Sequence, residues 1–342
     1  MKLEEHVPLA PLTTLGVGGT ARFFIEVHTE EDIENAITFA QQQNLPLCTL
    51  GGGSNILVPD EGIRGVVLKM AMRDISIEDG DENVMLVAGA GATWDEVIDT
   101  VGARGIFGIE NLAGIPGTIG GAAVQNIGAY GAELSDVFAY ADVIDSAVRA
   151  RKRVTRADAA FAYRTSFFKE HSGIIISRIT LCLTKQAKPN LAYADVARAH
   201  GAGTPLTTPR EIARAIRAIR AKKFPYVPGE GTAGSFFKNP VVSAELAASL
   251  AKRFSGLPTF PQDDGTVKIP LAWILDRVLS LKGYTVGPVR LYEEQPLVIV
   301  ARKGATTMDV DALARDVTTR VLAATGISIE REVETFGEKV FA

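Results

Sequence analysis

The segment best suited to bind phosphate is the run Gly51, Gly52, Gly53, Ser54 and Asn55. It separates an apolar stretch at 45–50 from a second short apolar stretch that begins at Ile56. Successive glycines allow neighbouring backbone N–H groups to point into one concavity, and such a nest binds phosphate oxygens. The serine and the asparagine add side-chain donors. The alternative is a plain hairpin turn, although a hairpin needs two special residues rather than five.

A second glycine-rich run matches the dinucleotide fingerprint literally but lacks its structural context. It reads Gly16, Val17, Gly18, Gly19, Thr20 and Ala21. The fingerprint requires a strand before it and a helix after it. No apolar strand precedes this run, and residues 22–27 have the pattern of a strand. We therefore reject a Rossmann site here and assign the phosphate loop to Gly51.

A long stretch at 106–131 is rich in Gly, Asn and Ala, and its periodicity fits neither a long helix nor a plain strand. Structureless loops of that length inside a compact domain usually carry function. A buried loop must find partners for its backbone polar groups, and a large, flat, polar ring system would supply them. The alternative is a self-packed loop stabilised by Asn111, Gln125 and Asn126.

Two further residues have neighbours that suggest chemistry. Arg164 lies between aromatic residues and could hold a carboxylate in a bidentate manner, or could be a surface arginine. Ser235 follows a glycine, precedes two phenylalanines and could donate a proton or act as a nucleophile, or could be a turn serine. With Lys238 it also has the Ser-x-x-Lys spacing of penicillin-recognising hydrolases, but their companion motifs are absent.

Three glutamates alternate near the end of the chain. Glu330, Glu332 and Glu334 would share one face of a strand. From spacing alone, we expect this face to be a solvated sheet edge.

The elements that must position these residues alternate between strands and helices. Helices are expected at 30–43, 94–101, 209–223, 243–254, 271–279 and 308–324. Strands are expected at 23–27, 45–50, 56–58, 66–68, 84–88, 137–148, 173–183, 297–301 and 328–336. A joint made by Pro225, Pro228, Gly229 and Gly231 is the expected main domain boundary.

Length, composition and charge set limits on the class of protein. The chain has 342 residues, of which 46% are hydrophobic, so two or three domains are expected. The net charge of −4 argues against non-specific binding to nucleic acid. Cys48 and Cys182 lie in apolar runs and are expected to be buried, reduced thiols. The four histidines have no metal-ligand spacing. Without a signal peptide or an apolar run that could span a membrane, we expect a cytoplasmic protein.

Taken together, these motifs resemble the UDP-N-acetylenolpyruvoylglucosamine reductases, a family of FAD enzymes in peptidoglycan synthesis. The resemblance covers nearly the whole chain, from Thr13 to Glu332. It is sharpest at 51–55, 115–117, 125–131, 163–164 and 234–240. The segment 191–193, which ends at Tyr193, resembles the tyrosine loop of the longer subtype.

The resemblance implies an α+β fold. A two-part FAD-binding domain of the vanillyl-alcohol-oxidase type would occupy 1–66 and 67–221, and a smaller α+β substrate-binding domain would occupy 222–342. The C-terminal strand would return to the active site. The implied protein is a monomer that uses neither nucleic acid nor a membrane as a partner.

The resemblance also assigns the site. Non-covalent FAD would contact Gly51, Gly52, Gly53, Ser54, Asn55, Ile56, Ile115, Pro116, Gly117, Gly121 and Gly128. The substrate would contact Tyr163, Tyr193, Lys223, Asn239, Lys282 and Gln295. The catalytic residues would be Ser235, Arg164 and Glu332.

The implied reaction is the NADPH-dependent reduction of UDP-N-acetylglucosamine enolpyruvate to UDP-N-acetylmuramate. Arg164 would stabilise the charge that develops next to the carboxylate, Glu332 would orient that end of the site, and Ser235 would protonate the carbanion. Phe260 stands where a tyrosine is expected, so one phosphate contact is missing or replaced. The rival classes are a sugar or alcohol oxidase of the same fold, a serine acyl hydrolase and a non-catalytic nucleotide-binding regulator.

Overall fold

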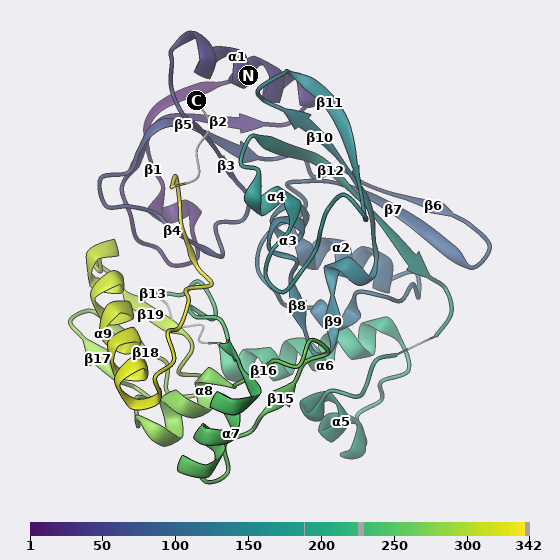
Figure 1. Ribbon diagram of the computed structural model, residues 1–342. Helices are drawn as coiled ribbons and strands as arrows, with labels where there is room; N and C mark the ends of the chain where they lie inside the picture. Colours follow the sequence, from purple (N-terminus) through teal and green to yellow (C-terminus); the bar gives the residue numbers. More distant parts are fainter. Residues whose placement is uncertain (188, 225–228, 339–342) are drawn as a thin grey trace.

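The first sheet carries the glycine-rich loop at the end of one of its strands. The computed structural model describes residues 1–187, 189–224 and 229–338 (Figure 1). The sheet has the order β1 (Leu3–Pro8), β2 (Thr20–Val27), β5 (Ile63–Met70), β3 (Leu47–Leu50). β2, β5 and β3 are parallel to one another, whereas β1 is antiparallel to β2. Helix α1 (Glu30–Gln42) connects β2 to β3, and the loop at Gly51 follows β3 directly.

Local sequence explains why α1 forms where it does. Thr29 accepts a hydrogen bond from the backbone of Asp32, and the Asp32 carboxylate accepts one from the Thr29 backbone. Such a reciprocal capping box satisfies backbone donors that a helix start leaves without partners. The buried face of the helix then consists of Ile33, Ala36, Ile37 and Ala40, at the spacing of one helical stripe.

The second sheet is antiparallel throughout, and four of the five helices that accompany it contribute residues to the cavity described below. Its order is β11 (Ala150–Thr155), β10 (Phe138–Asp145), β12 (Ile174–Thr184), β7 (Asn83–Gly89), β6 (Ile75–Asp79). Its helices are α2 (Trp94–Gly102), α3 (Ile119–Gln125), α4 (Phe167–Glu170), α5 (Ala194–Gly201) and α6 (Pro209–Lys223). A small hairpin of β8 (Gly128–Ala129) and β9 (Ala132–Glu133) follows α3. Short 3-10 turns occupy Ala10–Leu12, Glu110–Leu112 and Leu134–Asp136.

The C-terminal part has its own hydrophobic core, built around Phe236, Leu275 and Val317. One sheet has the order β13 (Glu230–Gly231), β19 (Ile299–Arg302), β18 (Val289–Leu291), β17 (Thr285–Val286). A smaller one has the order β14 (Val241–Val242), β16 (Val267–Lys268), β15 (Phe260–Pro261). The helices are α7 (Ala244–Arg253), α8 (Leu271–Trp273) with a π-helical turn at Ile274–Val278, and α9 (Thr307–Thr325).

The chain then returns to the N-terminal part. After α9 it runs as an extended segment, drawn in yellow in Figure 1, from the C-terminal sheet toward the first sheet. There β20 (Glu334–Thr335) pairs in parallel with β4 (Ile56–Leu57), directly after the glycine-rich loop. Residues more than 270 positions apart in sequence are thereby neighbours, since Glu334 N–H donates to the Asn55 carbonyl at 3.2 Å.

The strongly patterned elements agree with the expectations from sequence. Helix 209–223 has the expected bounds, and the glycine run at Gly16 is followed by strand β2 rather than a helix. The expected helix 271–279 is wrong in part, because it turns from α8 into a π-helical turn. The expected strand 328–336 is also wrong in part, since only Glu334–Thr335 has a strand partner. The expected strand 137–148 ends at Asp145, and the chain then turns back and forms β11.

The stretch 106–131 contains a helix that its composition conceals. Helix α3 begins after Thr118, whose hydroxyl accepts from Gly121 N–H at 3.4 Å, and ends at Asn126 in the left-handed conformation. Gly120 lies so close to Ala90 that an added Cβ would be 2.9 Å from the Ala90 Cβ. Glycine here serves close packing of the helix, although glycine disfavours helix formation in general.

The architecture is α+β, and the described residues form three hydrophobic clusters, of which the smallest lies on the first sheet. The expected boundary after residue 66 would cut strand β5, so we propose that the first subdomain extends through Met70. The expected boundary at residue 222 lies in the last turn of α6. Of the residues in the expected joint, Pro225 and Pro228 lie outside the described residues. None of the helices in the described part of the chain is long and apolar enough to cross a membrane.

The expectation that both thiols are buried is wrong for Cys182. On β12 the side chains of Leu181 and Leu183 enter the core, so the alternation of the strand leaves Cys182 exposed on the opposite face. Cys48 is 5% exposed, and burial raises the pKa of its thiol to about 12.

Thiol labelling therefore distinguishes the two cysteines. Because the thiolate is the reactive form, a disulfide reagent at pH 8 is expected to modify Cys182 rapidly and Cys48 only after unfolding. The release of chromophore per chain measures both phases. Cys182→Ser should abolish the rapid phase and retain the slow one. Two rapid thiols in the folded protein would contradict the burial of Cys48.

Candidate active site

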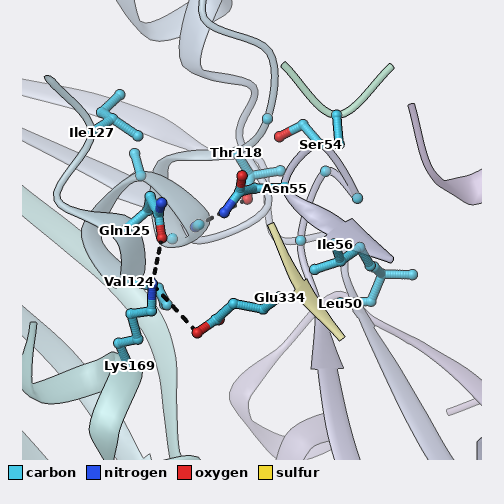
Figure 2. A pocket seen from close by; sticks show the side chains of 18 of the residues that line it. Leu50, Ser54, Asn55, Ile56, Thr118, Val124, Gln125, Ile127, Lys169 and Glu334 are labelled. Atoms are coloured by element: carbon cyan, nitrogen blue, oxygen red, sulfur yellow. Dashed lines mark hydrogen bonds and ion pairs between the residues drawn. The ribbon is translucent and has the colours of Figure 1, made fainter. Parts of the chain in front are cut away.

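One large cavity lies where the two N-terminal sheets, the loop before Phe236 and the returning C-terminal segment meet. Its volume is about 630 Å³, within the range of ligand sites. The segments that line it include 47–56, 115–118, 120–122, 233–235 and 331–338. Figure 2 shows part of this lining, with Ser54 and Asn55 on one side and Gln125 and Lys169 on another.

The glycine-rich loop and the stretch after Ile115 form one wall because they pack backbone against backbone. A Cβ added at Gly52 would lie 2.5 Å from the Gly117 Cα. Ser54 Oγ also donates to the Pro116 carbonyl at 2.9 Å, so a hydrogen bond joins the same two segments. Only glycine permits this approach, so the two motifs found by sequence depend on each other sterically.

The amides of this wall remain available to a ligand. None of the backbone N–H groups from Gly51 to Asn55 donates a hydrogen bond to another residue in the described part of the chain. Gly53 has φ +65°, and its carbonyl accepts from Thr14 N–H, which fixes the loop from behind. An anion such as a pyrophosphate would satisfy these amides, because a concave set of N–H groups favours phosphate oxygens. The residues therefore fit the pyrophosphate of FAD.

Arg164 and Glu332 form an ion pair inside the cavity lining. Arg164 Nε lies 2.7 Å from Glu332 Oε1, and the two side chains are 18% and 14% exposed. Arg164 Nη2 also donates to the Gly128 carbonyl at 2.9 Å. Nε of Arg164 is therefore occupied by the Glu332 carboxylate, while the guanidinium as a whole lines the cavity.

Ser235 is fixed by its backbone, which bridges to Val298, and it lines the cavity. The two phenylalanines that follow it are 1% exposed and anchor the loop in the C-terminal core. Phe236 N–H donates to the Leu297 carbonyl at 2.8 Å, and Glu332 N–H donates to the Phe236 carbonyl at 2.8 Å. Ser235 and Glu332 are thus held on neighbouring extended segments, and both line the cavity.

The three alternating glutamates differ in how far they match the solvated edge expected from their spacing. Each one pairs with a cation from another part of the chain. Glu330 lies 2.9 Å from Lys238 Nζ but is 76% exposed, as expected, and Glu334 lies 3.3 Å from Lys169 Nζ and is 38% exposed. Glu332, between them, is only 14% exposed because it pairs with Arg164. The expectation is therefore wrong for Glu332, whose partner comes from distant sequence.

All fourteen residues expected to be catalytic or to bind the cofactor line this cavity. They comprise Ser235, Arg164, Glu332, Gly51, Gly52, Gly53, Ser54, Asn55, Ile56, Ile115, Pro116, Gly117, Gly121 and Gly128. The structure therefore brings together residues from five separate regions of the sequence.

The six expected substrate contacts do not line the cavity. Tyr163 precedes Arg164 and hydrogen bonds to Asn239, whose Oδ1 accepts from Leu271 N–H at 3.0 Å. Burial raises the pKa of the Tyr163 phenol, although Arg164 acts in the opposite direction. This contact joins the N-terminal and C-terminal parts beside the cavity.

A second group of expected substrate contacts lies around α5 and α6. The rings of Tyr193 and Tyr130 pack edge to face with centroids 5.1 Å apart. Lys223 Nζ lies 2.5 Å from Asp195 Oδ2. Burial is the largest single influence and lowers the pKa of Lys223, but the hydrogen bond to Asp195 and the nearby charges of Asp195 and the tyrosines together outweigh it, so that the pKa is raised overall.

The last two expected substrate contacts lie apart from these groups. Lys282 pairs with Asp276 at 3.3 Å, next to the π-helical turn. Gln295 Oε1 accepts from Leu297 N–H at 3.5 Å. Neither contact reaches the cavity lining.

Several lining residues had no expected role. Lys169 is 8% exposed at its side chain, and Arg220 donates from Nε to the Gly114 carbonyl at 3.0 Å. Burial lowers the pKa of Arg220. A lysine or arginine that a fold buries has no signature in composition or spacing, so the sequence offered no signal for these two.

Comparison with known proteins identifies two family domains. A model of FAD-binding domains matches residues 21–148. A model of the C-terminal domain of UDP-N-acetylenolpyruvoylglucosamine reductase matches residues 227–336. The first match includes the glycine-rich loop and the second includes both Ser235 and Glu332.

Full-length relatives agree with these domains. The chain is 38% identical to the UDP-N-acetylenolpyruvoylglucosamine reductase of Pseudomonas aeruginosa, covering 97% of this chain and 98% of the relative. It is 35% identical to the enzyme of that name from Thermobifida fusca, with coverage of 97% and 98%. The crystal structure of UDP-N-acetylenolpyruvylglucosamine reductase from Thermus caldophilus superimposes with a TM-score of 0.69 at 26% identity, covering 98% of this chain and 99% of that one.

The contact of Gly52 with Gly117 generates a prediction about FAD binding. Gly52→Ala should push the two loops apart, and the dissociation constant for FAD should rise at least roughly tenfold, equivalent to about 1.4 kcal/mol. Flavin absorbance per purified chain and fluorescence titration of the apoprotein with FAD measure the effect. Gly201→Ala is the matched control, because nothing lies within 4 Å of an added Cβ there. Equal FAD affinity of both variants would refute the role of this contact.

Proposed function

Because the chain belongs to the family of UDP-N-acetylenolpyruvoylglucosamine reductases, we propose that it reduces UDP-N-acetylglucosamine enolpyruvate to UDP-N-acetylmuramate. NADPH is the hydride donor, FAD is the bound cofactor, and the product enters peptidoglycan synthesis. The observation that carries this proposal is the meeting of Arg164, Glu332 and Ser235 in one cavity with the glycine-rich loop.

The chain's own residues divide the cavity between cofactor and substrate. The amides of residues 51–55 would hold the pyrophosphate of FAD, and the segments around Ile115 and Gly128 would contact its ring system. When bound, the flavin supplies a two-electron carrier between NADPH and the enolpyruvyl double bond. The absence of a histidine from the phosphate loop is consistent with non-covalent binding.

Arg164 would stabilise the charge that the reduction creates. Hydride arrives at the terminal carbon of the enolpyruvyl group, so negative charge develops on the adjacent carbon and spreads into its carboxylate. A fixed cation beside that carboxylate stabilises the transition state, by about 3–4 kcal/mol for a well-placed donor. The guanidinium of Arg164 lines the cavity and is suited to this task, and Glu332 Oε1 holds it in place at 2.7 Å from Nε.

Ser235 would supply the proton that completes the reaction. A hydroxyl group is a weak acid, but a carbanion next to a carboxylate is a strong base, so proton transfer from Oγ is downhill. Its backbone is held between the C-terminal core and the segment that carries Glu332, and it lines the same cavity as the glycine-rich loop. Hydride and proton thus add to neighbouring carbons and yield the lactyl ether.

The rest of the nucleotide sugar would extend out of the cavity. We propose that Tyr163, Asn239, Tyr193 and Lys223 contact its sugar and diphosphate, with weaker support for Lys282 and Gln295 because they lie apart. Lys223 would exchange Asp195 for phosphate oxygens. Phe260 is 54% exposed on β15 and has no hydroxyl to offer a phosphate.

The hydrolase alternative has less support. In a Ser-x-x-Lys site, the lysine lies beside the serine and takes up its proton. Here Lys238 is instead paired with Glu330 at 2.9 Å, and Lys238 does not line the cavity that Ser235 faces.

We also propose that the enzyme acts as a cytoplasmic monomer. Its two soluble substrates, a nucleotide sugar and NADPH, favour that compartment. Every element of the cavity comes from a single chain, so the site needs no second copy.

Replacement of the proton donor separates the two half-reactions. Ser235→Ala should leave the reduction of the flavin by NADPH fast and should slow its reoxidation by the substrate roughly 100- to 10,000-fold. Anaerobic stopped-flow absorbance measures both rates. Ser255→Ala, at an exposed serine, serves as the control. An equal loss in both half-reactions would show that Ser235 is not the proton donor.

A further inference from the structure

Lys169 is a buried cation of the cavity lining with no part in the proton and charge chemistry described above. It lies on α4, and its side chain is 8% exposed. A buried ammonium is costly unless its charge is paired and its protons are hydrogen-bonded. The partners of the Lys169 ammonium therefore indicate the role of this residue.

The acceptors around the Lys169 ammonium include three that come from different parts of the chain. Nζ lies 3.0 Å from Gln125 Oε1 on α3, 3.0 Å from the Arg164 carbonyl and 3.3 Å from Glu334 Oε1 on β20. Figure 2 shows Lys169 reaching both Gln125 and Glu334. Lys169 therefore connects helix α3 to the segment that carries Arg164 and to the segment that carries Glu332 and Glu334.

The contact with Gln125 determines which end of an amide meets Glu332. An ammonium can only donate, so the Gln125 oxygen must face Lys169. The Nε2 end is then directed at Glu332 and donates to its Oε1 at 3.3 Å. If the amide turned over, two acceptors would face each other and repel the carboxylate. Lys169 thus keeps a donor on Glu332 without touching it.

The contact with Arg164 supports an unusual backbone conformation. Arg164 has φ +57°, in the left-handed region that non-glycine residues occupy only at a cost. Such residues persist where the surrounding structure determines them strongly. The Lys169 ammonium holds the carbonyl of this residue, while the side chain is held at the other end by Gly128 and Glu332. The guanidinium direction therefore depends on the lysine.

We propose that Lys169 is a positioning residue, which sets the Gln125 amide and the Arg164 backbone and so holds the Arg164–Glu332 pair ready for the substrate carboxylate. This inference rests on the proposed function, since it assigns the pair to that carboxylate. Lys169 would thus affect the rate at which the substrate is reduced, indirectly, through Gln125 and the Arg164 backbone.

The first test replaces the lysine and follows binding and chemistry separately. Lys169→Met should retain bound FAD and the fast reduction by NADPH, whereas reoxidation by the enolpyruvyl substrate should slow about 10- to 100-fold, as expected for misplaced catalytic groups. The dissociation constant of the substrate, measured from the change in the flavin spectrum, should change much less. Lys169→Arg keeps donors and charge and should restore part of the rate. Lys252→Met, at an exposed lysine on α7, is the matched control.

The second test addresses the route through Gln125. Gln125→Glu has the same shape and keeps an acceptor toward Lys169, but it presents an acceptor to Glu332, so reoxidation should slow as in Lys169→Met. Gln125→Leu removes the amide. In the Gln125→Leu variant, Lys169→Met should slow reoxidation by a smaller factor than it does in the wild type, because the contact through Gln125 has already been lost.

The outcomes separate the inference from the function on which it rests. Wild-type flavin that the substrate cannot reoxidise would refute the proposed function. If wild type turns over, a normal reoxidation rate in Lys169→Met, or equal losses in both half-reactions, would overturn the positioning role. If the reoxidation rate of the double variant falls by the product of the two single-variant factors, Lys169 does not act through Gln125. Should Lys169→Met fail to bind FAD, a normal rate in Gln125→Glu would refute the inference and a slow rate would support it.

Discussion

The ion pair between Arg164 and Glu332 is the interaction on which the cavity depends. One partner belongs to the N-terminal part and the other to the segment that returns after α9, and they meet at 2.7 Å. A partly buried pair of this kind is strongly destabilising when one partner is missing. The returning segment must therefore dock completely, which the parallel pairing of β20 with β4 and the bond from Asn55 Nδ2 to the Glu332 carbonyl achieve.

This constraint explains why chemistry from distant sequence can operate in one place. The glycine-rich loop supplies amides for phosphate, the loop at Arg164 supplies charge, and the loop at Ser235 supplies a proton. Glu332 contacts all three regions, since its carbonyl accepts from Asn55 Nδ2, its backbone N–H donates to the Phe236 carbonyl and its side chain pairs with Arg164. A ligand that bridges these regions would stabilise their docking, because binding to the folded state alone favours that state.

The sequence revealed the parts whose function requires a local pattern. Close contact between two loops requires glycine, as at Gly52 and Gly117, and these glycines form recognisable motifs in the sequence. Capped amphipathic helices such as α1 and α6 show the helical periodicity of their apolar residues. Long-range pairing leaves no such trace. The spacing of Glu332 predicted a solvated edge and gave no sign of its pair with Arg164, and nothing in the sequence distinguished Lys169 from other lysines. Even the resemblance to a known family gave Glu332 a role without indicating what holds it.

The central claim is that one cavity hosts both half-reactions of an FAD-dependent reduction. The most direct test is an anaerobic absorbance spectrum of the purified protein, to which NADPH and then UDP-N-acetylglucosamine enolpyruvate are added. The account predicts a flavin spectrum that bleaches with NADPH and returns with the enolpyruvyl substrate. A protein that neither contains FAD nor takes it up, or a reduced flavin that this substrate leaves unchanged, would contradict it.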